Sequence, residues 1–399
     1  MKILLVNKYW YLRGGAERVV LETKQLLEQA GHIVEIFGMN HPENIFSNKY
    51  FIDFIDYRKM TGWQKIKSAG KMIYNKKAKE NFTQLVNDFE PDVVHFHNIY
   101  HQLSFSLLDI IKEKNIPSVM TLHDYKMISP NYSLFHHGKI ADEICGCNYY
   151  RCVFNNCMED YANSLIATIE AYWRKFKKYS SYIDLYISPS EFLKNKFVKC
   201  GWDEKKVVVI NNPVSVSETE IQTGDYITFV GRLSKEKGVD VLLQAMALIP
   251  NIPLYIIGIG PAEEKLKKYV EENNLKNVKF CGFKSGQELT DLITKARLVV
   301  VPSIWYENYP MVVLEAKAMG KVVLASKIGG LIELLPEELL IDSQEPQTWA
   351  EAISLWYKKT DVDLIKHGEI LKQETIKKNS FAVYQKSLLN IYEKIIKHV

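Results

Sequence analysis

Residues 298–325 read LVVVPSIWYENYPMVVLEAKAMGKVVLA, and this stretch contains one complete unit of the fold. Residues 298–301 are apolar on both faces, as expected of a strand buried inside a parallel sheet. A polar loop follows, residues 311–319 have helical character, and residues 322–325 form a second apolar strand. A strand, a helix and a second strand in this order predict the right-handed βαβ unit of a doubly wound sheet.

The same alternation runs along the whole chain in two series, separated by a polar connection after Pro213. Strands of the first series are predicted at 2–6, 34–37, 93–97, 118–122, 185–188 and 207–210. Those of the second series are predicted at 227–230, 254–257, 278–281, 298–301 and 322–325. Helical stretches such as 17–30 and 105–114 lie between strands. The sequence therefore predicts an α/β protein with two Rossmann-like doubly wound domains, residues 1–212 and 218–380, which face a central cleft lined by strand ends.

The composition, with 47% hydrophobic and 25% charged residues, fits a soluble globular protein. The N-terminal apolar run is too short for a signal peptide, and no apolar stretch reaches about 18 residues, so we expect a cytoplasmic protein. The net charge of +4 gives no reason to expect a nucleic-acid partner.

Residues 57–79 contain eight Lys or Arg and no acid. This segment fits either a peripheral contact with the anionic inner face of the cell membrane or a solvated helix face.

Three glycine-containing loops follow predicted strands. Residues 13–17, RGGAE, open a helix, where backbone amides favour an anion, although a plain left-handed turn would also use these glycines. Residues 231–238, GRLSKEKG, place Arg232 and Lys237 within reach of one diphosphate, and the alternative is an exposed charged loop. Residues 258–261, GIGP, lack the third glycine of a dinucleotide fingerprint, so they are interpreted as a turn that borders a nucleotide rather than as an NAD site.

Two carboxylates follow the strand 298–301. Glu307 lies in the loop at its carboxyl end, and Glu315 lies eight residues later on the predicted helix. The two side chains can accept hydrogen bonds from different hydroxyls of one ligand, while the amides at the helix start can face an anion. Taken alone, a capping residue and a surface glutamate would explain the same pattern.

The motifs GRLSKEKG, GIGP and ENYPMVVLE, with seven residues between the glutamates, resemble the retaining glycosyltransferase family 4, which has the GT-B fold. The GGAE loop and residues 122–124 and 328–330 match as well, so the resemblance covers nearly the whole chain in the family's order. It implies a metal-independent hexosyltransferase without a cofactor. It also implies that a C-terminal helix, residues 381–399, packs back on the first domain.

The resemblance implies roles for single residues. Arg232 and Lys237 would grip the donor diphosphate, Glu315 the ribose and Glu307 the transferred sugar, with His123 beside that sugar. The implied catalytic residues are His123, Arg232, Lys237 and Glu307. The implied donor-binding residues are Gly14, Gly15, Arg232, Lys237, Glu307, Asn308, Tyr309, Pro310, Met311 and Glu315. Neither glutamate is expected to be a nucleophile; the leaving phosphate would itself accept the acceptor proton.

Histidines at the end of strand 93–97 predict an acceptor side. His95, His97, His101 and Tyr125 are the candidates, and hydrogen bonding to an acceptor is favoured over a histidine metal cluster. Residues 361–363, Asp-Val-Asp, are the one Asp-x-Asp in the chain, and they lie in a polar segment beyond the sheet. We therefore predict no metal.

Four of the six cysteines lie within thirteen residues: Cys145, Cys147, Cys152 and Cys157. Their spacing, C-x-C-x4-C-x4-C, leaves open a structural zinc site or a reduced loop near the acceptor. Disulfides are not expected in a reducing cytosol. Cys200 and Cys281 look isolated and are predicted to be small core residues.

The expected activity is transfer of a sugar from a nucleotide sugar to an acceptor hydroxyl, with retained configuration. UDP is the expected nucleotide and GDP the alternative. A lipid-linked glycan of surface polysaccharide or glycolipid synthesis is the expected acceptor. The competing interpretations are a catalytically silent protein that binds a nucleotide sugar as a scaffold, and a GT-B epimerase or phosphorylase.

Overall fold

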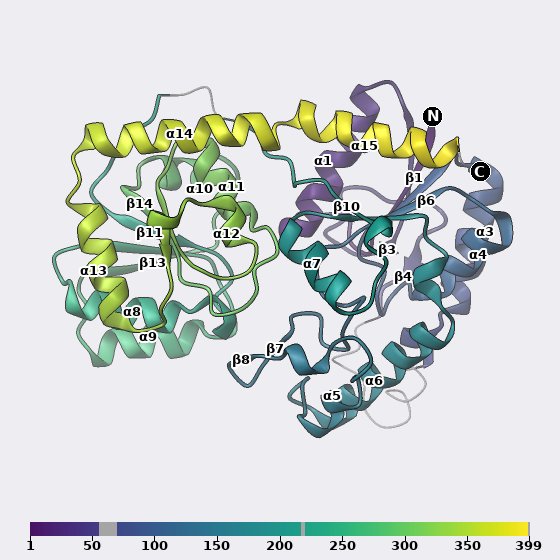
Figure 1. Ribbon diagram of the computed structural model, residues 1–399, viewed down its shortest axis with the longest axis horizontal. Coiled ribbons are helices and arrows are strands. Elements are labelled where there is room, and N and C mark those ends of the chain that lie inside the picture. The colour runs from purple at the N-terminus through teal and green to yellow at the C-terminus, as the bar shows by residue number, and fades with distance from the viewer. Residues whose placement is uncertain (56–69, 217–219, 398–399) are drawn as a thin grey trace. The chain divides into compact units, whose positions relative to one another are not determined.

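The computed structural model describes residues 1–55, 70–216 and 220–397, and the chain forms two compact units (Figure 1). The first unit comprises Met1–His136, Ala141–Pro213 and Tyr384–Val399, and the second comprises His137–Ile140 and Val214–Val383. Residues 57–69 of the basic segment lie outside the described residues. None of the helices in the described ranges has the length and apolar character needed to cross a membrane.

The first unit contains a six-stranded parallel sheet, as predicted. Its strand order is β10 (Val207–Val209), β9 (Leu185–Ser188), β6 (Ser118–Thr121), β5 (Val93–Phe96), β1 (Lys2–Val6) and β2 (Ile33–Phe37). Residues 3–6 of β1 have no exposed surface, which explains why this strand is apolar on both faces. The predicted strand ends differ from the observed ones by at most one residue, so the sequence pattern located this sheet well.

Helices connect these strands. They are α1 (Gly15–Gln29), α3 (Lys76–Phe89), α4 (Leu108–Lys114), α5 (Arg151–Phe154), α6 (Tyr161–Phe176) and α7 (Glu191–Lys199). Three of them begin at a residue whose side chain accepts a hydrogen bond from a first-turn amide: Asn75 before α3, Asp160 before α6 and Ser190 before α7. Such caps satisfy backbone donors that the helix itself leaves unpaired. The short strands are β3 (Met39–Asn40), β4 (Ile52–Asp53), β7 (Phe135–His136) and β8 (Lys139–Ile140).

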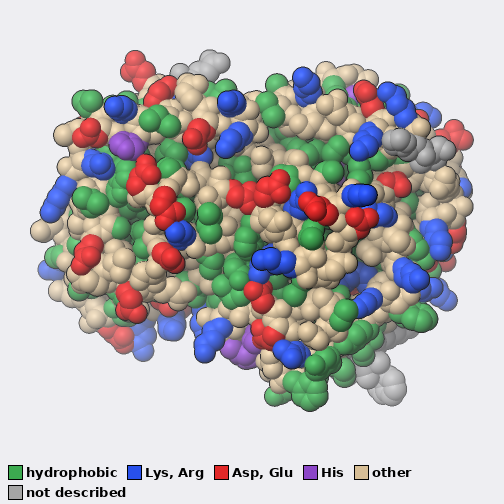
Figure 2. Space-filling view, viewed as in Figure 1, with side chains coloured by type: hydrophobic (Ala, Val, Ile, Leu, Met, Phe, Trp, Pro, Cys, Tyr) green, Lys and Arg blue, Asp and Glu red, His purple; other side chains and the backbone are tan. Residues whose placement is uncertain are grey.

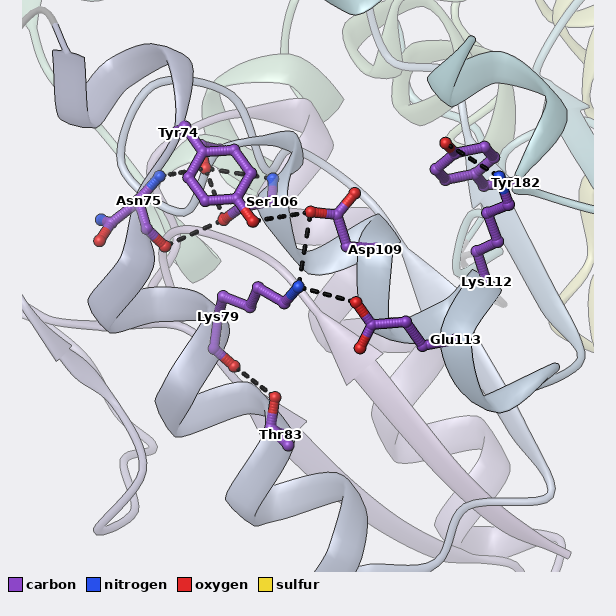
Figure 3. Close-up of polar contacts among 10 residues, drawn as sticks. Tyr74, Asn75, Lys79, Thr83, Ser106, Asp109, Lys112, Glu113 and Tyr182 are labelled. Atoms are coloured by element: carbon purple, nitrogen blue, oxygen red, sulfur yellow. Dashed lines mark hydrogen bonds and ion pairs between the residues drawn. The ribbon is translucent and has the colours of Figure 1, made fainter. Parts of the chain in front are cut away.

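The described end of the basic segment, residues 70–79, leads into α3 and is joined to α4 by polar contacts (Figure 3). The Lys79 ammonium lies 2.9 Å from Glu113 Oε1 and 3.6 Å from Asp109 Oδ2. The Tyr74 hydroxyl donates to Asp109 over 2.8 Å. Lys79 therefore binds its own unit, whereas Lys71 and Lys76 are exposed.

The second unit contains another six-stranded parallel sheet. Its order is β13 (Val278–Gly282), β12 (Leu254–Ile257), β11 (Ile227–Val230), β14 (Leu298–Val301), β15 (Val323–Ser326) and β16 (Leu340–Ile341). The helices of this unit are α8 (Val239–Leu248), α9 (Glu263–Glu272), α10 (Gly286–Thr294), α11 (Met311–Ala318), α12 (Leu331–Leu334), α13 (Pro346–Tyr357) and α14 (Asp361–Asn379). β16 was not predicted, because two residues carry no recognisable periodicity.

The last helix, α15 (Phe381–Ile396), places two tyrosines against the first unit. The Tyr384 and Thr23 hydroxyls lie 2.8 Å apart. The Tyr392 hydroxyl lies 2.6 Å from Nδ1 of His95, and both side chains are completely buried. The apolar stripe of this helix thus joins the core around β5.

The cysteines differ from the prediction in three ways, the simplest being that Cys281 is partly exposed rather than a core residue. Cys152 and Cys157 form a disulfide, so the expectation of a fully reduced loop is wrong, and so is the four-thiolate zinc site, because two of its sulfurs are bonded to each other. Cys200 is not an isolated core residue: its sulfur lies 2.8 Å from that of Cys145. Spacing along the chain could not reveal this pair, since 55 residues separate its members.

Candidate functional site

The loop after β11 is held by the glycines of the next βα turn. A Cβ on Gly258 would lie 1.9 Å from the Gly231 carbonyl oxygen, and one on Gly260 would lie 2.3 Å from that of Leu233. The Leu233 amide donates to the Ile259 carbonyl over 3.0 Å. The GIGP turn therefore lies against the GRLSKEKG loop and can fit there only because it lacks side chains.

Lys237 and Glu307 meet at the carboxyl ends of β11 and β14. The Lys237 ammonium lies 2.6 Å from Glu307 Oε1, and the Ser303 hydroxyl donates to the same oxygen over 2.7 Å. Glu307 is 5% exposed, and the side chain of Lys237 is 23% exposed. Two residues that the sequence assigned to the donor diphosphate and the sugar thus form one ion pair, although 70 residues separate them.

The charge state of Glu307 follows from these contacts. Burial would raise the pKa of Glu307, but the charge of Lys237 and hydrogen bonds from Lys237 and Ser303 hold that pKa below its ordinary value. Glu307 is therefore a carboxylate at neutral pH and can accept hydrogen bonds from hydroxyl groups.

Glu315 lies one turn into α11 and is 9% exposed. Pro310 precedes this helix, and its ring cannot make a capping hydrogen bond. The backbone before the helix rests on the loop after β15: the Gly330 amide donates to the Glu307 carbonyl over 2.6 Å, and a Cβ on Gly330 would lie 1.8 Å from the Asn308 carbonyl oxygen. This support fixes the position of Glu307 relative to the helix start and Glu315.

Other predicted donor residues are placed differently. Arg232 is exposed, and its guanidinium has no ion pair or hydrogen bond among the described residues. Tyr309 is 6% exposed, and its hydroxyl accepts a hydrogen bond from Asn379 over 3.1 Å, so its ring belongs to the core of the second unit. Met311 begins α11. An exposed guanidinium remains available to a ligand.

In the first unit, three histidines line up at the ends of β5 and β6. His95 and His97 stack with ring centroids 4.2 Å apart, and Nδ1 of His97 lies 2.9 Å from Nε2 of His123. Burial lowers the pKa of His95 to about 3 and that of His123 to about 4, so these imidazoles are neutral at neutral pH. His95 uses both ring nitrogens, toward Tyr392 and Thr121. His95 is completely buried, so it holds His97 in place by stacking and is not itself available to a ligand.

The other predicted residues of this unit vary in exposure. Tyr125 is completely buried, and His101 is partly exposed, with its Nε2 3.9 Å from Glu170 Oε2. Gly14 and Gly15 are exposed, and α1 begins at Gly15. The glycine loop, His101 and His123 are therefore the members of the predicted set that present surface in this unit.

Sequence reasoning missed a buried charged cluster beside His101. The Lys126 ammonium lies 2.5 Å from Glu170 Oε2, and Arg174 Nη1 lies 3.8 Å from Glu170 Oε1. All three side chains are at most 4% exposed. Burial raises the pKa of Glu170, but the charges of Lys126 and of its neighbours, Arg174 among them, together with the hydrogen bond from Lys126 lower that pKa below its ordinary value, so the carboxyl is ionised. Nearby, burial raises the pKa of Asp124 to about 6. The sequence pointed to this cluster only through Lys126, which lies two residues after the motif at 122–124.

Solved structures with this fold include sucrose-phosphate synthase from Thermosynechococcus elongatus, with a TM-score of 0.73 and 20% identity over 100% of both chains. Another is HepE of Anabaena in complex with UDP-glucose, with a TM-score of 0.64 and 18% identity over 100% of this chain and 99% of that one. These likenesses show that the two sheets make up a GT-B fold, the predicted fold class.

The family follows from the sequence itself. Residues 13–218 match the family model Glycosyltransferase Family 4, and residues 214–378 match the model Glycosyl transferases group 1. The first match covers more than half of the chain, so the protein belongs to glycosyltransferase family 4. A protein in the cps region of Klebsiella pneumoniae is 25% identical over 84% of this chain and 87% of its own length.

Proposed function

We propose that the protein transfers a sugar from a nucleotide sugar, with UDP as the nucleotide and GDP as the alternative, to an acceptor hydroxyl. The observation that carries the proposal is the arrangement of Lys237, Ser303 and Glu307 beside the start of α11, with Glu315 one turn further on. A cation and the backbone amides of a helix start suit a diphosphate, and two carboxylates suit sugar and ribose hydroxyls. The related structure with UDP-glucose supports this donor class.

The proposed chemistry is retention without an enzymic nucleophile and without a metal. Lys237 and the exposed Arg232 would stabilise the charge that develops on the leaving diphosphate. The diphosphate oxygen accepts the proton of the attacking hydroxyl on the same face of the sugar. Glu307 would orient the transferred sugar, and neutral His123 would donate a hydrogen bond to it. In this proposal Lys237 exchanges its partner, from the Glu307 carboxylate to the donor phosphate.

Donor binding can be tested by thermal shift, because a ligand that binds only the folded protein raises its midpoint. We expect UDP-glucose or another nucleotide sugar to raise the midpoint of the wild type and of Glu338→Ala, an exposed control in the same unit. Glu315→Ala should lose most of the shift. A shift that survives in Glu315→Ala would refute the ribose role, and no shift of the wild type with any nucleotide sugar would refute the donor class.

Turnover separates an enzyme from a scaffold. Purified protein should hydrolyse its donor slowly or transfer the sugar, and the product should keep the anomeric configuration of the donor. Binding without turnover on a panel of acceptors would favour the silent scaffold. Interconversion of the donor, or phosphate-dependent release of its sugar, would favour an epimerase or phosphorylase. Activity that persists in excess chelator supports the metal-free route.

The proposed acceptor is a lipid-linked glycan at an anionic membrane surface. Support comes from a set of large apolar side chains exposed on α5 and α6, which we call the α5–α6 apolar face (Figure 2). Its members are Tyr150, Phe154, Tyr161, Leu165, Ile169, Tyr172 and Phe176. Those on α6 recur every three or four residues and so share one side of the helix. Arg151, Lys175 and Lys178 are exposed on or beside the same helices. Aromatic side chains flanked by cations suit an anionic lipid interface.

Vesicle flotation tests the membrane surface. We expect the wild type to float with vesicles that contain phosphatidylglycerol, and Phe154→Ser/Phe176→Ser to bind at least about tenfold more weakly, since these side chains are 79% and 77% exposed. The matched control is Leu355→Ser/Val362→Ser, which changes two exposed apolar residues of the second unit. If the wild type does not float with vesicles, the α5–α6 apolar face does not bind lipid and a protein partner becomes the better explanation. The proposed nucleotide-sugar donor would be unaffected by that result.

A further inference from the structure

Cys145 and Cys200 bring two thiols together in the first unit. Their sulfurs lie 2.8 Å apart, with Cys200 donating to Cys145. Cys145 follows a short 3-10 helix, Asp142–Ile144, and Cys200 follows α7. Both side chains are partly exposed. Neither the donor chemistry nor the acceptor surface uses this pair.

Independent contacts hold the two backbones at this separation. The Lys196 ammonium on α7 lies 2.8 Å and 2.7 Å from the two carboxylate oxygens of Asp142. Gly146 lies so near α7 that a Cβ on it would be 3.9 Å from the Cα of Cys200. The Gly146 amide also donates to the Ile128 carbonyl over 3.0 Å. The thiols are therefore neighbours because three segments pack here, which keeps the two sulfurs together before any oxidation.

We propose that Cys145 and Cys200 are a thiol–disulfide exchange site that reacts with small anionic disulfides such as oxidised glutathione and closes a second disulfide. The Cys145 thiolate attacks one sulfur of the oxidant, forms a mixed disulfide and releases one glutathione thiolate. Cys200 loses its proton to water, and its thiolate displaces the second glutathione from Cys145. Two protein thiols are oxidised and one disulfide is reduced to two thiols, so electrons and atoms balance.

The surroundings favour this order of events. The hydrogen bond from Cys200 lowers the pKa of the Cys145 thiol, and the pKa of Cys200 is raised by donating it. Cys145 is therefore the attacking sulfur. A cavity of about 360 Å³ beside the pair is lined by Cys200 and Cys147, by the ammonium-bearing Lys175 and Lys206, and by Asp203. The two ammonium groups would attract the carboxylates of a glutathione-like oxidant to Cys200 and to the neighbouring Cys145.

Closing the bond would fasten α7 to the segment that follows β6. Through the Gly146–Ile128 hydrogen bond this segment continues back to Lys126 and His123. Oxidation would thus restrict the backbone on the predicted acceptor side. The inference stands whether or not the proposed glycosyl transfer is correct, because it concerns thiol chemistry alone.

Peptide mapping tests the site on the full chain. After incubation with oxidised glutathione and alkylation of remaining thiols, we expect a linked peptide that joins Cys145 to Cys200 in the wild type and in the controls Cys281→Ser and Cys147→Ser. Cys200→Ser should instead retain one glutathione on Cys145, because the sulfur that would release it is missing. Cys145→Ser should react far more slowly at position 200.

The outcomes that would overturn the proposal are distinct. A linked peptide that joins Cys147 to either partner would assign the exchange to another pair. If Cys145 and Cys200 of the wild type are still alkylated after incubation with every concentration of oxidised glutathione, the pair does not react with it. Thiols protected by a bound metal and released only by a chelator would show a metal site instead. Peptide mapping of the wild type alone shows whether Cys145 and Cys200 become linked, so the proposal can be tested even if a variant fails to fold.

Discussion

Lys237→Met removes the cation from the buried pair with Glu307. In the wild type the ammonium lies 2.6 Å from Oε1 of a carboxylate that is 5% exposed. Methionine has a similar length and can still pack near the Trp305 ring, whose centroid lies 5.2 Å from the ammonium. The substitution therefore tests charge rather than shape and leaves the carboxylate with the Ser303 hydrogen bond.

The magnitude follows from burial. Leaving a fully buried charge without its partner costs about 3–5 kcal/mol, and since Lys237 is 23% exposed we expect about 2–3 kcal/mol at neutral pH. Lys267→Met is the control in the same unit. The Lys267 ammonium lies 2.7 Å from a carboxylate oxygen of Glu263, a distance close to that of the Lys237–Glu307 pair, but both side chains are more exposed. Because solvent screens that pair, its loss of stability should be much smaller than that of Lys237→Met.

The pH dependence gives the sign of the effect. In the wild type the pKa of Glu307 is below its unfolded value of about 4.3, so its stabilisation is present above that pH and is lost as pH falls through the folded-state pKa. Without Lys237, burial raises the pKa of Glu307, and the variant loses stability as pH rises above about 4.3. The gap between wild type and variant should therefore widen from about pH 4 to neutrality.

Urea unfolding of the full chain at several pH values measures this gap. Lys237→Met/Glu307→Gln should recover part of the stability, because it removes the buried charge along with its partner. A loss in Lys237→Met equal to that in Lys267→Met, with no dependence on pH, would show that the pair is not buried and coupled as described.

Three further perturbations test other parts of the molecule. Glu170→Gln strands the ammonium of Lys126, which is 1% exposed, and should cost about 3 kcal/mol or more in urea unfolding; a loss below about 1 kcal/mol would contradict the buried pair. Tyr392→Phe leaves Nδ1 of His95 without its buried partner and should cost about 1–2 kcal/mol, whereas an unchanged midpoint of thermal unfolding would argue against that contact. Gly330→Ala puts a Cβ 1.8 Å from a backbone carbonyl oxygen, so it should displace the Glu307 loop and weaken the thermal shift by nucleotide sugars; a wild-type shift would show that the loop tolerates a side chain.

Much of the fold could be predicted because its information is local. The strand β14 and the helix α11 were predicted within a residue of their observed ends, since four apolar residues followed by a helical period are visible in a short window. The positions of Glu307 and Glu315 at a strand end and on a helix came from the same pattern. β16, with two residues, has too little pattern to be predicted.

The contacts within the sites could not be predicted. Lys237 and Glu307 were assigned separate roles, and nothing in either motif shows that they form a pair. Glu170 and Arg174 belong to a helix whose other face carries exposed aromatic side chains, so their burial has no local signature. The disulfide between Cys152 and Cys157 was missed because the compartment argument favoured thiols.

The sequence by itself determined the order of the strands and helices, every strand of the two large sheets except β16, and the loops that carry the charged motifs. It could do so because a strand or helix shows its burial pattern within a few neighbouring residues. Only the tertiary structure decided which side chains meet: Lys237 with Glu307, Tyr392 with His95, and Cys145 with Cys200. The physical reason is that each of these contacts depends on how whole elements pack, and residues 55 to 297 positions apart carry no mutual pattern along the chain.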